Sequence, residues 1–241
     1  MRSRFLVNTC FAATAFVSLS DYRHLKSGRV FLECAAIYKW NKDSPNVKHD
    51  ICARKLLGLF LENGGVYVKI GQSMAALVYL LPAEYTNTLK VLQNQCSPRS
   101  LDLVKLVIEK EVDISSCQIT SLHPEPLGVG SLAQVHKGTM VINGQQLVVA
   151  FKVQHAELES QALADIRTCA NMVQLLKYMF PEFNLFWLAD ELEMSLPLEL
   201  DFRKEAENCR LLEANNTVRG VYFPKVYLAT KRLLVMECNN N

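Results

Sequence analysis

The fold is decided by a stretch that begins PLGVGSLAQVHKG at Pro126–Gly138, continues through Asn143-Gly144, and ends LVVAFKV at Leu147–Val153. Asn-Gly between two runs of strand-forming residues is the strongest short signal of a β-hairpin. The small residues near the start of the stretch favour a tight loop between strands. The sequence therefore predicts a strand, a small-residue loop, and a hairpin whose second strand carries Lys152.

Lys152 is the sharpest candidate for chemistry, because it lies within an apolar run of Val, Leu and Phe. An unpaired buried ammonium group is costly, so this lysine must point toward something polar. Val149-Ala150-Phe151-Lys152 matches the V-A-I-K pattern of kinases, in which a strand lysine meets the nucleotide phosphates. Taken alone, a lysine such as Lys152 is more typical of the solvent face of an edge strand. The loop and hairpin that precede it favour a nucleotide site instead.

The loop candidate is Gly128-Val129-Gly130-Ser131. Small residues form turns in many proteins, so this signal is weak by itself. Its position before a strand, a hairpin and Lys152 is the order that a phosphate-covering loop requires. Backbone N–H groups approach phosphate oxygens closely only where side chains are small. We therefore predict nucleotide binding at these four residues and Lys152.

The composition is that of an ordinary folded protein. The chain has 241 residues, of which 50% are hydrophobic and 21% charged, and a formal net charge of +2. This length allows one large or two small domains, and so small a charge argues against a nucleic-acid partner. The eight cysteines contain no C-x-x-C pair, which predicts free thiols in a reducing compartment and no metal site.

The N-terminal segment, residues 1–29, is predicted to be a targeting or membrane-proximal segment. Arg2, Ser3 and Arg4 precede the apolar stretch Phe5–Leu19, and the first acidic residue is Asp21. A basic, acid-poor start of this kind is typical of a mitochondrial presequence. The stretch is shorter than the roughly 18 residues that span a bilayer. An uncleaved anchor and a secretory signal are the alternatives.

The rest of the chain changes period near residue 115. Apolar residues at helical spacing predict helices in residues 30–42, 50–62, 66–81, 84–95 and 101–112. Strands follow in 121–154, a long helix in 157–180, one or two helices in 184–215, and strands in 221–229 and 232–237. Pro197 is predicted to break or kink the second helical region. Residues 30–115 thus form a helical domain, and 116–241 a domain with a sheet and a helical insertion.

Two further motifs carry charge within apolar helices. Lys69-Ile70-Gly71-Gln72 lies in one of them, and a mid-helix glycine costs about 1 kcal/mol against alanine, which indicates close packing at Gly71. Glu199, Asp201 and Glu205 lie close together, with the last two on one helix face. Because Leu and Phe side chains accompany them, some of these carboxylates need cationic partners.

Together these motifs resemble the UbiB / aarF-domain atypical kinase family. Lys69-Ile70-Gly71-Gln72 resembles the family's K-x-G-Q motif, and the loop with Ser131–His136, Lys152, and Glu199-Leu200-Asp201-Phe202 followed by Glu205 resemble its kinase motifs. Residues 78–85 and 180–183 are most similar to the mitochondrial aarF-domain kinase subgroup linked to mitochondrial lipid homeostasis. The family loop is often Ala-Ala-Ala-Ser, from which Gly128–Ser131 departs.

The resemblance implies an α+β fold, in which a protein-kinase-like N-lobe follows an all-helical N-terminal extension. It implies that Lys152 contacts ATP or ADP bound with Mg²⁺, and that Glu205 is its ion-pair partner. Lys69, Gly71 and Gln72 would belong to a regulatory extension over the site, with Lys69 paired to Glu199 or Asp201. The resemblance implies that the substrate is a small molecule or lipid, or that the protein acts as an ATPase. It also implies contact with a mitochondrial membrane.

Residues 232–237 resemble the strand that enters a kinase hinge, with Met236 and Glu237 at the hinge. No later stretch matches the catalytic loop or the metal-binding D-F-G. We therefore expect no catalytic residue in this chain, weak nucleotide binding, no efficient phosphate transfer, and a C-lobe in a longer protein. The alternatives are a short non-catalytic regulatory module and a helical membrane-associated protein in which the lysine and loop are incidental.

Overall fold

The computed structural model describes residues 22–94, 96–112, 118–142, 144–181 and 187–238. Residues 1–21 of the predicted targeting segment 1–29 and Asn143 lie outside the described residues, whereas residues 22–29 of that segment are helical. The chain divides into two compact units. The helical unit comprises Met1–Asn94 and Gln161–Leu192, and the sheet unit comprises Gln95–Ser160 and Glu193–Asn241.

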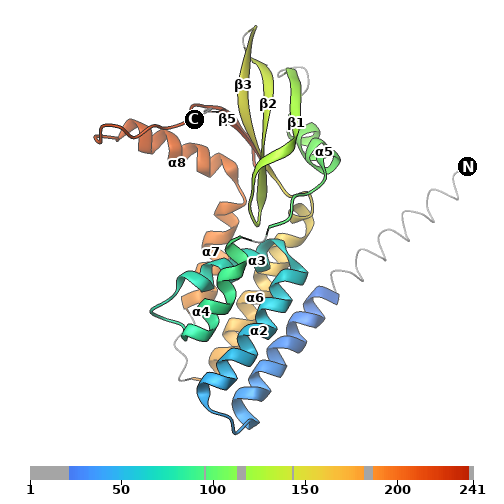
Figure 1. Ribbon diagram of the computed structural model, residues 1–241, viewed down its shortest axis with the longest axis vertical. Coiled ribbons are helices and arrows are strands. Elements are labelled where there is room, and N and C mark those ends of the chain that lie inside the picture. The colour runs from blue at the N-terminus through green and yellow to red at the C-terminus, as the bar shows by residue number, and fades with distance from the viewer. Residues whose placement is uncertain (1–21, 95, 113–117, 143, 182–186, 239–241) are drawn as a thin grey trace, which may run out of the picture. The chain divides into compact units, whose positions relative to one another are not determined.

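The helical unit consists of helices that lie side by side (Figure 1). It contains a helix in residues 22–40, α2 (Pro45–Asn63), α3 (Gly65–Ala76), α4 (Ala83–Leu89), the 3-10 helix η1 (Lys90–Gln93), most of α6 (Leu158–Met179) and the start of α7 (Trp187–Glu199). Gly64 separates α2 from α3 with φ 66° and ψ −164°, a conformation that glycine adopts at little cost. The break predicted between the helices in residues 50–62 and 66–81 is confirmed.

A buried ionic contact joins the first described helix to α6. Arg23 Nη2 lies 2.6 Å from Asp165 Oδ2, and Arg23 Nη1 donates to the Asn63 carbonyl at 2.7 Å. Burial raises the pKa of the Asp165 carboxyl. Removing one partner of such a pair would leave an uncompensated buried charge, which costs far more than the pair gains. The contact therefore fixes how residues 22–40 pack inside the helical unit.

The sheet unit contains a five-stranded antiparallel sheet in the order β1-β2-β3-β5-β4. The strands are β1 (Gln118–Val129), β2 (Ala133–Ile142), β3 (Gln145–Gln154), β4 (Val226–Ala229) and β5 (Leu233–Glu237). Ile142 pairs with Gln145, so two residues close the β2–β3 hairpin, and Gly144 has φ 78°. The hairpin predicted from Asn143-Gly144 is confirmed.

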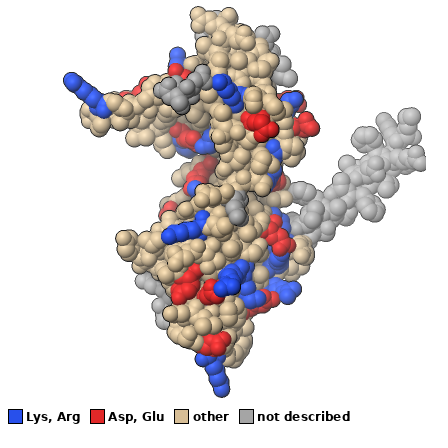
Figure 2. Space-filling model, viewed as in Figure 1, with Lys and Arg blue, Asp and Glu red and all other residues tan. Residues whose placement is uncertain are grey.

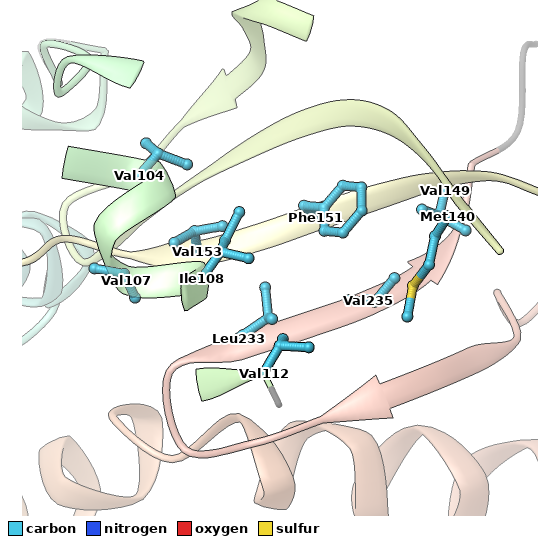
Figure 3. Packing of buried hydrophobic residues seen from close by; sticks show 10 residues of the cluster. All are labelled: Val104, Val107, Ile108, Val112, Met140, Val149, Phe151, Val153, Leu233 and Val235. Atoms are coloured by element: carbon cyan, nitrogen blue, oxygen red, sulfur yellow. The ribbon is translucent and has the colours of Figure 1, made fainter. Parts of the chain in front are cut away.

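The two faces of the sheet are covered by different helices. On one face, α5 (Leu101–Glu111) packs against β3 and β5 (Figure 3). This core cluster consists of Val104, Val107, Ile108, Val112, Met140, Val149, Phe151, Val153, Leu233 and Val235. On the other face, α8 (Phe202–Ala214) contributes Phe202 and Ala206 to a smaller cluster with Ala133 and Leu234. Alternate residues of β3 therefore point to different helices.

The boundaries of three helices and one strand correct four predictions. Pro197 lies inside α7, and the break comes after Glu199 because Asp201 is extended and caps α8. The helix predicted to reach residue 81 ends at Ala76, and the apolar residues Val78, Tyr79 and Leu80 that follow it are exposed. The helix predicted for 84–95 ends at Leu89 and continues as η1. The strand predicted for 221–229 begins at Val226.

The two compact units also differ from the domain boundary predicted near residue 115. The α5 helix, expected in the helical extension, belongs to the sheet unit because its apolar side chains are buried against β3 and β5. Residues 161–192, expected in the second domain, belong to the helical unit. Sequence order alone does not show this exchange, since α6 begins in one unit and continues in the other.

Charge is dispersed on the face drawn in Figure 2. Lys and Arg side chains are interspersed with Asp and Glu and do not merge into one basic surface there, in keeping with the net charge of +2. Six cysteines fall within the described residues, and all six are free. None of the helices that the structure describes is long and apolar enough to cross a membrane.

Candidate functional site

Lys152 lies in the middle of the sheet, on the face that α8 covers. In the strand register it pairs with Val135 on β2 and Leu234 on β5. Leu234 belongs to the cluster with Phe202 of α8, whereas the neighbouring Phe151 belongs to the α5 cluster. The pleat of β3 therefore turns the lysine away from the main core and toward α8.

The structure brings Lys152 and Glu205 together. Lys152 Nζ lies 2.7 Å from Glu205 Oε1 and 2.6 Å from Oε2, and it also lies 4.8 Å from the centroid of the Phe202 ring. The side chains are 27% and 44% exposed. An ammonium group over an aromatic face is further stabilised, so the Lys152 side chain is held in one direction while its Nζ stays accessible.

Glu205 is held in place by the start of α8. It lies in the first turn of this helix, where the helix dipole favours a carboxylate. The Asp201 side chain accepts a hydrogen bond from the Arg203 N–H and caps the same helix end. Arg203 Nη2 also lies 2.6 Å from Asp201 Oδ2, and this bonding lowers the pKa of Asp201. Asp201 therefore orients the helix that presents Glu205.

The predicted phosphate loop is a tight connection between β1 and β2. Gly130 N–H donates to the Ala133 carbonyl at 2.8 Å, which closes the turn. Gly128 and Val129 form the end of β1, and Ser131 lies at the turn before β2. Gly130 is not in the left-handed region, since the described glycines with positive φ are elsewhere. The loop is thus an ordinary backbone turn with small side chains, as the motif indicates.

His155 supports this loop, and sequence reasoning missed it. Its Nε2 donates to the Gly130 carbonyl at 2.9 Å, and its backbone N–H donates to the Leu132 carbonyl at 3.0 Å. The ring is buried, and Nδ1 has no hydrogen-bond partner among the described residues. Burial lowers the pKa of His155, because a proton on Nδ1 would be left without an acceptor. The sequence feature that could have identified His155 is its position directly after the strand that carries Lys152.

A second buried polar group anchors the segment before α5 to the sheet. His136 Nδ1 donates to the His123 carbonyl at 2.8 Å, so its Nε2 accepts from Gln134 Nε2 at 2.8 Å. Gln134 also accepts from Arg99 N–H at 2.7 Å and donates to the Arg99 carbonyl at 3.1 Å. These contacts give Gln134 and His136, part of the motif around Ser131, a structural role in holding β1, β2 and residue 99 together.

We predict that the support from His155 depends on pH. Its pKa is lowered from 6.5 in the folded chain, so the unfolded chain binds the proton more tightly. The stability that it contributes is present above pH 6.5 and is lost as the pH falls through the lower folded pKa. The stability difference between the wild type and His155→Gln should therefore shrink as the pH falls below 6.5, measured by amide exchange of β2. A difference that is constant with pH would contradict this.

The motif Lys69-Ile70-Gly71-Gln72 lies in α3 of the helical unit. Gln72 Nε2 donates to the Leu92 carbonyl at 2.9 Å, which ties α3 to η1. Glu199 ends α7, and Asp201 lies between α7 and α8, in the sheet unit. The pairing of Lys69 with Glu199 or Asp201 stays a prediction.

The close packing predicted at Gly71 is present. A Cβ atom there would lie 2.3 Å from Leu92 Cδ1 and 2.6 Å from Phe60 Cδ2. We predict that Gly71→Ala destabilises the helical unit by about 1–3 kcal/mol through overpacking, although alanine is the better helix former. Gly58→Ala on α2 is the matched control, because its Cβ would meet nothing within 4 Å, and it should stabilise by up to about 1 kcal/mol. Urea unfolding followed by Trp187 fluorescence measures both; equal effects would contradict the packing argument.

The predicted hinge residues lie at the end of β5. Met236 packs against the Ala133 and Phe202 cluster, and Glu237 N–H donates to the Lys225 carbonyl at 2.9 Å. Hydrogen bonds to Glu237 from Tyr222 and Lys225 lower its pKa. Both residues are also in register with β3. Their service as a hinge to a further lobe stays a prediction.

An antiparallel sheet that presents a strand lysine to a glutamate on a covering helix is the kinase-like N-lobe fold. The sequence model of the ABC1 atypical kinase-like domain matches residues 91–240, and the chain belongs to this family. It is 35% identical to AarF domain-containing kinase 1 of Drosophila melanogaster, over 91% of this chain and 45% of the relative. It is 41% identical to AarF domain-containing protein kinase 1 of Mus musculus, over 77% of this chain and 35% of the relative.

Two other relatives agree with this family. ABC1 family protein MCP2 homolog of Schizosaccharomyces pombe is 39% identical, over 78% of this chain and 34% of the relative. Among solved structures, the complex of Rv3197 with erythromycin from Mycobacterium tuberculosis is similar, with a TM-score of 0.50 and 25% identity over 74% of this chain and 46% of that chain. The chain therefore spans less than half the length of the relatives named here.

Proposed function

We propose that this chain is the nucleotide-binding region of an ATP-dependent kinase or ATPase of the ABC1 family. The proposal places its action in mitochondria, on a small molecule or lipid, in mitochondrial lipid homeostasis. The observation that carries it is the ion pair between Lys152 and Glu205, on the sheet that also carries the small-residue loop. The basic, acid-poor N-terminal sequence supports the mitochondrial location. The resemblance of residues 78–85 and 180–183 to the mitochondrial subgroup supports the role in lipid homeostasis.

The chemistry of the site fits a nucleotide phosphate. Glu205 holds the Lys152 ammonium in place, with Lys152 Nζ 2.6 Å from Glu205 Oε2. A phosphate oxygen that meets Lys152 gains a charge-assisted hydrogen bond to a donor that is already oriented. The turn at Gly130 and Ser131 carries only small side chains, so a phosphate group can come close to its backbone. Binding and orientation of ATP, not bond cleavage, is the function that these residues support.

Mg²⁺ is the metal that the family implies, and the side chains described here do not form a site for it. No group of three or more His, Cys, Asp or Glu side chains in the described part of the chain could hold a metal ion. The Glu205 carboxylate beside Lys152 is paired with that lysine. The described residues therefore supply no ligand set for Mg²⁺.

Calorimetric titration of the 241-residue chain with ATP, ADP and inorganic triphosphate tests this function. We expect ATP and ADP to bind, with dissociation constants at the weak end of the micromolar-to-millimolar range (roughly −8 to −4 kcal/mol). Triphosphate alone should bind less well, because it lacks the base and ribose. Absence of heat with all three ligands at millimolar concentration would refute the proposal.

A further inference from the structure

The helical unit contains a cavity of about 580 Å³ that the nucleotide site does not use. Its walls come from the helix in residues 22–40 and from α2, α3, α4, α6 and α7. The side chains that line it are aliphatic and aromatic, with a few hydroxyls and thiols. Among the described residues that line it, none is Lys, Arg, Asp or Glu. The volume is typical of small-molecule sites, which span roughly 300–1,000 Å³.

Tyrosine hydroxyls provide the polar contacts in the wall. Tyr38 Oη lies 2.9 Å from Tyr85 Oη and also contacts His49 Nδ1. Both tyrosines line the cavity. Burial raises the pKa of Tyr38 to about 12 and that of Tyr85 as well, so both phenols are neutral. A neutral phenol can donate and accept a hydrogen bond, which suits a hydroxyl or carbonyl group of a ligand.

An exposed apolar turn adjoins this cavity. Val78, Tyr79 and Leu80 follow α3 and are all exposed, and Tyr79 is 99% exposed. Leu80 and the next residue, Leu81, also line the cavity. Contiguous apolar residues on a surface mark contact with an apolar phase or partner. The turn therefore gives the cavity an apolar approach of the kind that a water-insoluble ligand needs.

We propose that this cavity binds one neutral amphiphile with a single long hydrocarbon chain and a hydroxyl or carbonyl head group. The apolar wall holds the chain, and Tyr38 and Tyr85 hold the head group. A cavity of about 580 Å³ is large enough for one amphiphile of this kind, since small-molecule sites span roughly 300–1,000 Å³. A charged head group would lose its hydration without a counter-charge in the wall, which is costly. This inference does not rest on the proposed nucleotide function.

Trp187 provides a direct reporter, because it lines the cavity and the chain has two tryptophans. The other is Trp40, which is exposed, and Trp40→Phe leaves Trp187 alone. Dibrominated stearyl alcohol should quench Trp187 fluorescence saturably in this variant of the full chain. Oleyl alcohol should compete, whereas oleate should compete at least about tenfold less well. Equal competition by oleate, or no saturable quenching, would overturn the proposal.

Two variants on α6 separate binding in the cavity from binding to the surface. Val173 lines the cavity, whereas the exposed Leu175 does not. In the Trp40→Phe background, Val173→Phe should weaken quenching at least about tenfold, and Leu175→Phe should leave it unchanged. Equal quenching in both variants would show adsorption to the surface and refute the cavity site. Tyr38→Phe with Tyr85→Phe should reduce the preference for oleyl alcohol over octadecene by about tenfold; an unchanged preference would refute the head-group assignment.

Cysteine alkylation tests the same site without a substitution, should Val173→Phe fail to fold. Cys34 lines the cavity, whereas Cys209 belongs to α8 in the sheet unit. Oleyl alcohol should slow iodoacetamide labelling of Cys34 at least about threefold, as expected for a site that is mostly occupied. Labelling of Cys209 should not change. An unchanged Cys34 rate at an alcohol concentration that quenches Trp187 would contradict the proposed position.

Discussion

Replacing Lys152 by Met is expected to abolish the thermal stabilisation that ATP gives to the folded chain. Lys152 is the cation that Glu205 and Phe202 orient, and methionine preserves much of its length without the charge. At an ATP concentration ten times Kd, binding stabilises the wild type by about 1.4 kcal/mol. That corresponds to a rise in Tm of about 3–6 °C for a chain of this size. Differential scanning fluorimetry with and without ATP measures the effect.

Lys204→Met is the control for this prediction. Lys204 is adjacent to Glu205 on α8, but its ammonium pairs with Glu207 at 2.9 Å and is exposed. An exposed pair of this kind contributes little to stability, so this variant should keep the full response to ATP. If Lys152→Met retains the wild-type shift in Tm, nucleotide binding at this lysine is wrong. If both variants lose it, the effect is a general loss of positive charge.

Phe151→Ala is expected to destabilise the sheet unit by about 3–5 kcal/mol. Phe151 on β3 is completely buried and belongs to the cluster that β3 and β5 form with α5 (Figure 3). Its removal leaves a cavity that surrounding strands cannot close without breaking their register. Because Lys152 follows it directly on β3, the lysine would also lose its fixed position. Native-state hydrogen exchange of β2 and β3 amides measures this unit separately from the helical unit.

Val148→Ala on the same strand is the matched control, since Val148 is 44% exposed. A surface substitution of this kind should change stability by no more than about 0.5 kcal/mol. Similar losses for Phe151→Ala and Val148→Ala would mean that the α5 face of the sheet is not the main core of the unit.

The hairpin and its lysine were predictable because their signals are local. Asn143-Gly144 specifies a two-residue turn, and the register Ile142 with Gln145 follows from it. Glu205 lies 53 residues from Lys152 in the chain, and no spacing rule connects a strand to a helix that far away. That pair was expected from the family resemblance alone. The family motif therefore predicted a contact that the spacing of apolar residues could not predict.

Other features depend on tertiary contacts that the sequence does not specify. The hydrogen bond from His155 to the Gly130 carbonyl exists because the end of β3 returns beside the loop. The length of α7 beyond Pro197 depends on the Asp201 cap. The cavity in the helical unit is lined by α6 together with α2 and α3, although the whole β1–β3 region separates α6 from them in the sequence. Apolar periodicity identifies these helices but not the space between them.

The most direct test of the nucleotide site is chemical labelling of lysine by an acyl-phosphate derivative of ATP, with the labelled residue identified by mass spectrometry. Such a probe transfers its acyl group to an amine that contacts the bound phosphates. We predict that Lys152 is the principal labelled lysine, that excess ATP prevents its labelling, and that Glu205→Gln reduces it. Labelling spread over surface lysines and unaffected by ATP, with Lys152 unmodified, would contradict the assignment of this site to a nucleotide.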